Sequence, residues 1–69
     1  MDRQDVHSSM IKSIGWEASI LEVEFVTNGS IYRYYGVGKE TFEQLRAAPS
    51  VGQYFTAQIK NLFPFARIK

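Results

Sequence analysis

The residues best suited to binding chemistry lie together at positions 31–36, where the chain reads IYRYYG. Aromatic rings stack on the bases of single-stranded nucleic acids, and an arginine can contact the phosphates. The end of the chain is basic, since no acidic side chain follows Glu43. Rings and cations together predict a nucleic-acid-binding surface. The candidate binding residues are Arg33, Tyr35, Lys60, Arg67 and Lys69.

Catalytic chemistry has weaker support. His7 stands in a polar segment beside Ser8, and adjacency in sequence does not provide the geometry of a base and a nucleophile. Glu22 and Glu24 share a strand face as a carboxylate pair would, but an arginine on the next strand supplies a structural explanation. Residues 36–39 lack the spacing of a phosphate-binding loop. The chain is therefore predicted to be non-enzymatic and to need no cofactor.

The composition describes one small domain. With 69 residues, the chain buries only about 60% of the surface that its unfolded form exposes. It has no cysteine and one histidine, which excludes disulfides and the common zinc sites, so no metal is predicted. Ten aromatic rings are left to supply the core. No apolar run approaches the roughly 20 residues that span a bilayer, and the start is too polar for a signal peptide. A cytoplasmic protein without membrane contact is predicted.

Three strands must position the candidate residues. The first covers residues 10–16, where Gly15 marks a bend or a close approach of another backbone segment. The second covers residues 20–26, whose alternation of apolar and acidic side chains predicts one buried face. Asn28-Gly29 then predicts a two-residue type I′ turn, because both central residues of that turn need positive φ. Residues 31–36 form the returning strand.

This turn determines which residues lie opposite one another and so share a face. It sets Phe25 opposite Tyr32, and Glu24 opposite Arg33. The predicted apolar face consists of Leu21, Val23, Phe25, Tyr32 and Tyr34. The other face carries Glu22, Glu24, Val26, Ile31, Arg33 and Tyr35.

A three-residue loop would instead slip the register by one and bury Arg33 opposite Val23. In the first register, Tyr32 and Tyr34 are core residues whose hydroxyls reach the edge for a hydrogen bond. Only Arg33 and Tyr35 are then offered to the open face.

Two helices follow the strands. The first runs from about Gly38 to Pro49, which ends it. The second begins after Ser50, which forms a capping box with Gln53. Pro64 keeps the remaining residues extended. The predicted fold is α+β, a three-stranded antiparallel β-meander followed by two short α-helices packed on one sheet face. Residues 1–8 are expected to be a flexible leader, and residues 9–69 a single domain.

The order and spacing of these features resemble the KTSC domain, a family found at the C-terminus of some lysyl-tRNA synthetases and as free-standing bacterial and phage proteins. The resemblance covers nearly the whole chain. It implies a small binding module of undefined role without any assigned catalytic residue, and the association with a tRNA synthetase suggests RNA as the ligand. The residues that carry it are Ser9, Ile11, Ile14, Gly15, Trp16, Leu21, Val23, Phe25, Tyr32, Tyr34, Tyr35, Val37, Gly52, Tyr54, Phe55 and Ile59.

A second hypothesis is a protein-interaction module or a homodimer. The sequence pI of about 8.1 is less basic than that of most autonomous nucleic-acid binders, and Glu22 and Glu24 would repel phosphates from the open sheet face. Exposed apolar residues could instead bury area against another protein or a second copy. The candidate patches are Val26 with Ile31 and Tyr35, or Phe63 with Phe65.

Overall fold

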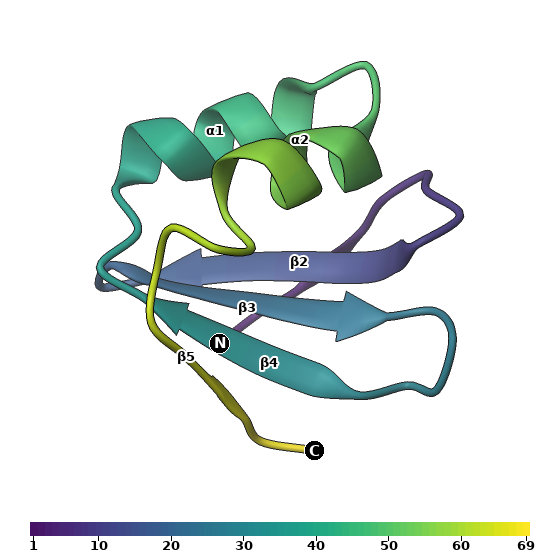
Figure 1. Cartoon of the computed structure of the whole chain (residues 1–69), viewed down its shortest axis with the longest axis horizontal. Coiled ribbons are helices and arrows are strands. Elements are labelled where there is room, and N and C mark those ends of the chain that lie inside the picture. The colour runs from purple at the N-terminus through teal and green to yellow at the C-terminus, as the bar shows by residue number, and fades with distance from the viewer.

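The computed structural model, which describes all 69 residues, is a five-stranded antiparallel sheet with two helices on one of its faces (Figure 1). Each strand lies beside its neighbours in sequence, in the order β1-β2-β3-β4-β5. Neither helix is long and apolar enough to cross a membrane. The elements are β1 (Gln4–Asp5), β2 (Ile11–Glu17), β3 (Ile20–Phe25), β4 (Ile31–Tyr35), α1 (Lys39–Ala47), α2 (Val51–Gln58) and β5 (Phe65–Arg67).

The α+β class and the two helices are confirmed, but the expected number of three strands is wrong. The meander β2-β3-β4 gains one short strand at each edge, because β1 pairs with β2 and β5 pairs with β4. Strands of two and three exposed residues are too short to show an alternating pattern in sequence. The division of the chain at residue 8 stays a prediction, although Gln4–Asp5 already pairs with the sheet.

The connection between β3 and β4 also differs from the expected two-residue turn. Four residues, 26–29, separate Phe25 from Ser30, and the Phe25 N–H donates to the Ser30 carbonyl at 2.9 Å. The Asn28 side-chain oxygen accepts from the Ser30 N–H at 3.1 Å, and Gly29 alone supplies a positive φ, 68°. The longer loop moves the register by two, so Arg33 lies opposite Glu22 rather than Glu24. Because the shift is even, every side chain keeps its predicted face.

The tight turn lies instead between β2 and β3. Glu17 pairs with Ile20, and the two residues between them, Ala18 and Ser19, have φ values of 51° and 66°. Non-glycine residues adopt this left-handed conformation at a cost. The Ser19 carbonyl accepts from the Gly36 and Val37 N–H groups at 2.9 and 3.0 Å, which holds the turn against the entry to α1.

We expect the double substitution Ala18→Asn and Ser19→Gly to raise the free energy of unfolding by about 1 kcal/mol, since this pair favours positive φ at both positions. The backbone hydrogen bonds of residue 19 remain available. Urea denaturation of both proteins measures the change. A loss of stability would show that the strain is not relieved by residues suited to the turn.

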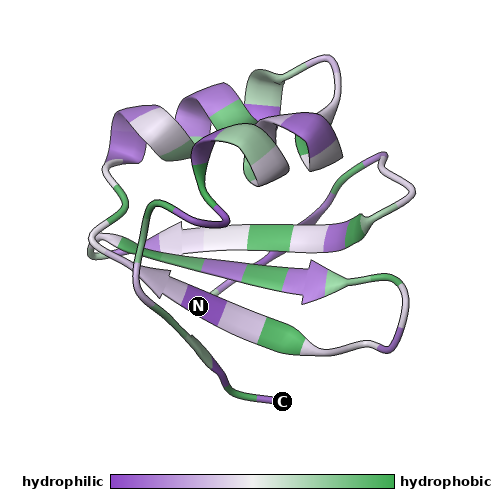
Figure 2. Ribbon diagram, in the orientation of Figure 1, coloured by the Kyte–Doolittle hydropathy of each residue, from purple (hydrophilic) through white to green (hydrophobic).

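The core lies between the helices and the sheet, and hydrophobic residues recur along strands β2, β3 and β4 (Figure 2). The predicted Ser50 cap forms, with the Ser50 hydroxyl accepting from the Gln53 N–H at 3.3 Å. Helix α2 thereby places the ring of Phe55 5.3 Å from that of Tyr34 and 5.6 Å from that of Phe25. The fully buried side chains are Phe55, Ile11, Ile14, Leu21, Leu45, Ile59, Val23 and Val37.

Candidate binding site

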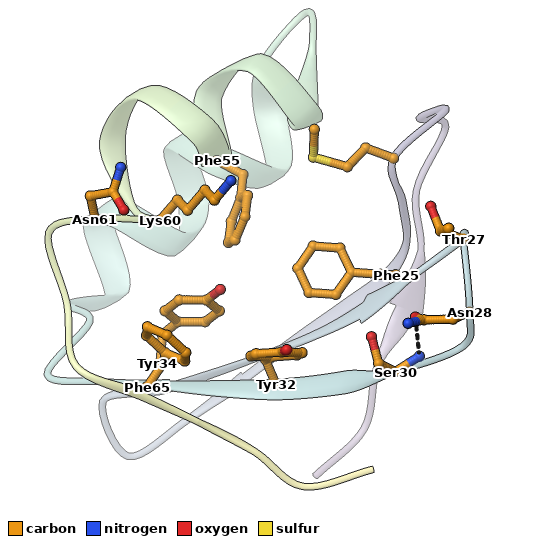
Figure 3. Close-up of a pocket in the computed structure, with 11 residues that line it drawn as sticks. Phe25, Thr27, Asn28, Ser30, Tyr32, Tyr34, Phe55, Lys60, Asn61 and Phe65 are labelled. Atoms are coloured by element: carbon orange, nitrogen blue, oxygen red, sulfur yellow. Dashed lines mark hydrogen bonds between the residues drawn. The ribbon is translucent and has the colours of Figure 1, made fainter.

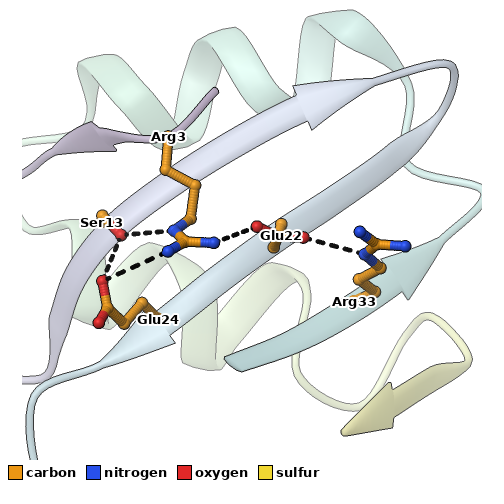
Figure 4. A network of polar contacts seen from close by, with 5 residues as sticks. All are labelled: Arg3, Ser13, Glu22, Glu24 and Arg33. Carbon is orange, nitrogen blue, oxygen red and sulfur yellow. Dashed lines mark hydrogen bonds and ion pairs between the residues drawn. The ribbon is translucent and has the colours of Figure 1, made fainter. Parts of the chain in front are cut away.

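The open face of the sheet carries a network of charged side chains (Figure 4). Glu22 lies at its centre, and its side chain is only 4% exposed. Arg33 Nε donates to Glu22 Oε1 at 2.9 Å, and Arg3 forms an ion pair with the other carboxylate oxygen. Arg3 Nε also donates to Ser13 Oγ at 3.0 Å, and Ser13 donates to Glu24 at 2.8 Å. Two arginines and two glutamates therefore neutralise one another on this face.

Glycine at position 15 lets Arg3 reach this network. A Cβ atom on Gly15 would lie 2.6 Å from the Asp2 carbonyl oxygen and 3.0 Å from Cγ of Arg3. The close backbone approach predicted at Gly15 is confirmed. The approaching segment is the start of the chain itself.

The pKa of Glu22 responds to this environment. Burial alone would raise it, but the hydrogen bonds and charges of Arg33 and Arg3 outweigh that effect and hold the pKa below its usual value of 4.5. Glu22 is therefore ionised at neutral pH, and Arg33 already has a partner. An arginine with a paired carboxylate is a weaker phosphate ligand than an unpaired one.

The opposite face of the sheet holds an aromatic cavity of about 470 Å³, whose lining side chains lie between the sheet and α2 (Figure 3). Its walls come from β3, β4, β5 and α2, and from the segments before β2, between β3 and β4, and after α2. The partly exposed rings of Phe25 and Tyr32 meet edge to face at 5.5 Å, and the rings of Tyr32 and Phe65 lie 5.7 Å apart. The lining residues are Met10, Phe25, Thr27, Asn28, Ser30, Tyr32, Tyr34, Phe55, Lys60, Asn61 and Phe65.

Tyr34 contributes an unpaired hydroxyl to this aromatic cavity. The residue is only 4% exposed, and its hydroxyl has no hydrogen-bond partner in the protein. Every side-chain N or O atom that is sealed from solvent has a hydrogen-bond partner, so the unpaired Tyr34 hydroxyl must be accessible. Figure 3 shows this hydroxyl directed into the cavity. Burial, with a smaller contribution from Tyr32, raises the pKa of Tyr34 to about 12. The hydroxyl of Tyr32 likewise has no hydrogen-bond partner within the protein, and the expectation that both hydroxyls reach the edge for a hydrogen bond stays a prediction.

The charges around the aromatic cavity are of one sign. Lys60 is the only charged residue among the 11 that line it. Arg67 pairs with Tyr32 across β4 and β5, so both side chains leave the sheet on the cavity side. Glu22 and Glu24 lie on the opposite face. Nowhere in the chain do three or more His, Asp or Glu side chains gather as metal ligands would.

The five sequence-predicted binding residues therefore do not form one surface. Arg33 and Tyr35 belong to the open face, where Tyr35 is 37% exposed. Lys60 and Arg67 lie on the cavity side, and Lys69 accepts at its carbonyl from Arg67 Nε at 3.0 Å. Sequence reasoning missed the aromatic cavity, for which the only signal was a pair of hydroxyls on an otherwise apolar strand face.

Comparison with known proteins places these features in a family. A crystal structure of a KTSC domain protein from Yersinia pestis has a TM-score of 0.92 to this chain at 36% identity, and the match covers 99% of this chain and 97% of that one. An uncharacterised protein of Stutzerimonas stutzeri is 40% identical over 62 residues, which are 87% of this chain and 86% of the relative.

A third relative is much longer. The lysine–tRNA ligase of Nostoc punctiforme is 39% identical over 62 residues, and the match covers only 11% of that enzyme. The sequence model of the KTSC domain matches residues 7–63, which is most of this chain. Sequence, fold and relatives agree with the resemblance found in the residues, and the chain belongs to the KTSC domain family.

Proposed function

We propose that this KTSC domain is a small non-enzymatic module of the cytoplasm that binds single-stranded RNA on its cavity side. The observation that carries the proposal is the aromatic cavity, whose lining includes one lysine and no acidic residue. Rings that accept bases and cations that contact phosphates are the two elements of single-strand recognition. The match to part of a lysine–tRNA ligase supports RNA as the nucleic acid.

The two faces of the sheet differ in what they offer an RNA strand. On the open face Arg33 is paired with Glu22, and the carboxylates of Glu22 and Glu24 would repel a phosphate. On the cavity side, Lys60 and Arg67 have no acidic partner. The proposal therefore gives Lys60, Arg67 and Lys69 the main phosphate contacts and leaves Arg33 and Tyr35 a secondary role.

The affinity of such a site depends on salt. Three phosphate contacts predict a slope of about −2 in a plot of log affinity against log salt concentration for a single strand. We expect the triple variant Lys60→Gln, Arg67→Gln and Lys69→Gln to bind more weakly and to flatten this slope. Fluorescence anisotropy of labelled single-stranded RNA and tRNA at about 50 and 200 mM salt measures both effects.

The matched control lowers the net charge by the same amount elsewhere. It combines Lys12→Gln, Lys39→Gln and Arg46→Gln, whose side chains do not line the aromatic cavity. Retained affinity in this control locates the binding face. Equal losses of RNA affinity in both triple variants would show that binding depends on net charge alone. If the wild-type protein binds RNA at neither salt concentration, the proposal is wrong.

The alternative, a protein partner or self-association, keeps Val26 and Tyr35 of its first candidate patch exposed but loses Ile31. Ile31 of the first candidate patch is only 7% exposed, because Ile68 and Lys69 hydrogen-bond to its backbone and extend the sheet past it. Phe65 is 56% exposed but belongs to the aromatic cavity. Sedimentation equilibrium at several concentrations tests the homodimer, which a monomer throughout the range would eliminate.

A further inference from the structure

We infer that the aromatic cavity binds a single unstacked nucleobase, with the phosphate attached to that nucleotide held at Lys60. The inference deepens the proposed function and rests on it for the source of the base, an RNA strand. Three properties of the cavity lead to this ligand: its size and aromatic lining, the unpaired hydroxyl of Tyr34 and its charge.

The size of the cavity and its aromatic lining suit one flat ring. A volume of about 470 Å³ lies within the range of roughly 300 to 1,000 Å³ of small-molecule sites. It holds one nucleotide rather than a stretch of strand. Tyr32 is partly exposed and Phe65 is 56% exposed, so these neighbouring rings still offer surface on which a base can stack.

The hydroxyl groups require a ligand with polar atoms at its edge. Tyr34 is more than nine-tenths buried, and its hydroxyl is directed into the cavity without a protein partner. A purely aliphatic ligand would displace water from this hydroxyl and leave it unsatisfied, which is unfavourable. The ring nitrogens and carbonyl oxygens of a base can pair with it, and the Asn61 side chain offers a second polar contact from the cavity wall.

The charge favours an anion attached to that ring. Lys60 is exposed and lines the cavity beside Asn61, and no carboxylate lines it. A cationic ligand would meet Lys60 without a counter-charge. A flat ring with a polar edge and an attached anion is the chemistry of a nucleotide.

The experiment compares a short oligoadenylate with an abasic oligonucleotide of the same length, which keeps the phosphates and lacks the bases. We expect the abasic strand to bind roughly 5- to 150-fold more weakly, as the loss of one stacked base implies. The substitution Phe65→Ala should reduce oligoadenylate affinity to a similar extent and leave abasic affinity unchanged. Tyr34→Phe, which keeps the ring, should also weaken oligoadenylate binding. The control Tyr54→Phe removes a hydroxyl that donates to Gln44 outside the cavity, and it should have no effect.

The outcomes separate this inference from the proposed function. Equal affinities for the two strands would overturn the base site while RNA binding remained. If neither strand binds, the proposed function fails, and adenosine monophosphate then tests the cavity alone by NMR. Shifts of the Phe25, Tyr32 and Phe65 ring signals, absent with ribose phosphate, would establish a site for the free nucleotide. No shifts would overturn the inference.

Discussion

Replacing Tyr34 with alanine is expected to lower the free energy of unfolding by about 3 to 5 kcal/mol, the usual cost of truncating a buried aromatic ring. Its ring lies 5.3 Å from that of Phe55 and 5.5 Å from that of Phe65, so its removal opens the core between α2 and β5. Tyr35→Ala should cost less than about 1 kcal/mol, because its side chain stands at the surface on the other face. Urea denaturation followed by the fluorescence of Trp16, the only tryptophan, measures both.

The variant Tyr34→Phe separates the ring from its hydroxyl. It should cost less than about 1 kcal/mol, since no protein hydrogen bond is lost. The raised pKa of the phenol implies stability that is complete below its ordinary value of 10 and is lost as the pH rises towards about 12. An ultraviolet titration should show one late-titrating phenol that disappears in Tyr34→Phe. Equal costs for Tyr34→Ala and Tyr35→Ala would contradict the assignment of the two strand faces.

Glu22→Gln is expected to lower the free energy of unfolding by about 2 to 3 kcal/mol, somewhat less than the usual cost of breaking a buried ion pair. The cost is reduced because the side chains of Arg3 and Arg33 are 28% and 39% exposed and keep part of their hydration. The matched control is Glu43→Gln, which breaks the exposed pair with Arg46 and should cost no more than about 0.5 kcal/mol.

The stability difference between the wild-type protein and Glu22→Gln should depend on pH, because the pKa of Glu22 is lowered in the folded state. A carboxyl whose pKa is lower in the folded state contributes stability above its unfolded pKa, near 4.5, and loses it as the pH falls through the folded pKa. The gap between the wild-type protein and Glu22→Gln should therefore be constant from neutral pH down to about 5 and then narrow. Urea midpoints across this range measure the gap, and a gap of unchanged size at about pH 3 would rule out the ion pairs as its cause.

Several local features were predictable because they depend on neighbouring residues alone. The alternation in residues 20–26 assigned Val23 and Phe25 to the helix side and Glu22 to the open face, and the structure confirms this. The Ser50 cap and the end of α1 before Pro49 depend on a few consecutive residues in the same way. The family was also recognisable, since its residues are spread through the chain in order.

The register of β3 and β4 was not predictable from the same pattern. A two-residue turn and a four-residue loop set the same side chains on the same faces, so apolar alternation cannot distinguish them. The choice between them determines that Arg33 contacts Glu22 rather than Glu24. The four-residue loop is closed by the hydrogen bond from the Ser30 N–H to the Asn28 side chain and by the one from the Phe25 N–H to the Ser30 carbonyl. Whether these bonds form depends on the path of the backbone through the loop.

The candidate binding site most clearly separates what the local sequence determines from what tertiary packing determines. The sequence alone determined that Tyr34 faces the helices, because a period of two is a local property of a strand. Only the tertiary structure decided that its hydroxyl lies in a cavity beside Lys60, since that depends on where α2 ends and on how β5 returns to pair with β4. Similarly, the pairing of Arg3 with Glu22 joins residues 19 apart through the space above Gly15. Distances between segments far apart in the chain are set by packing, and no local pattern encodes them.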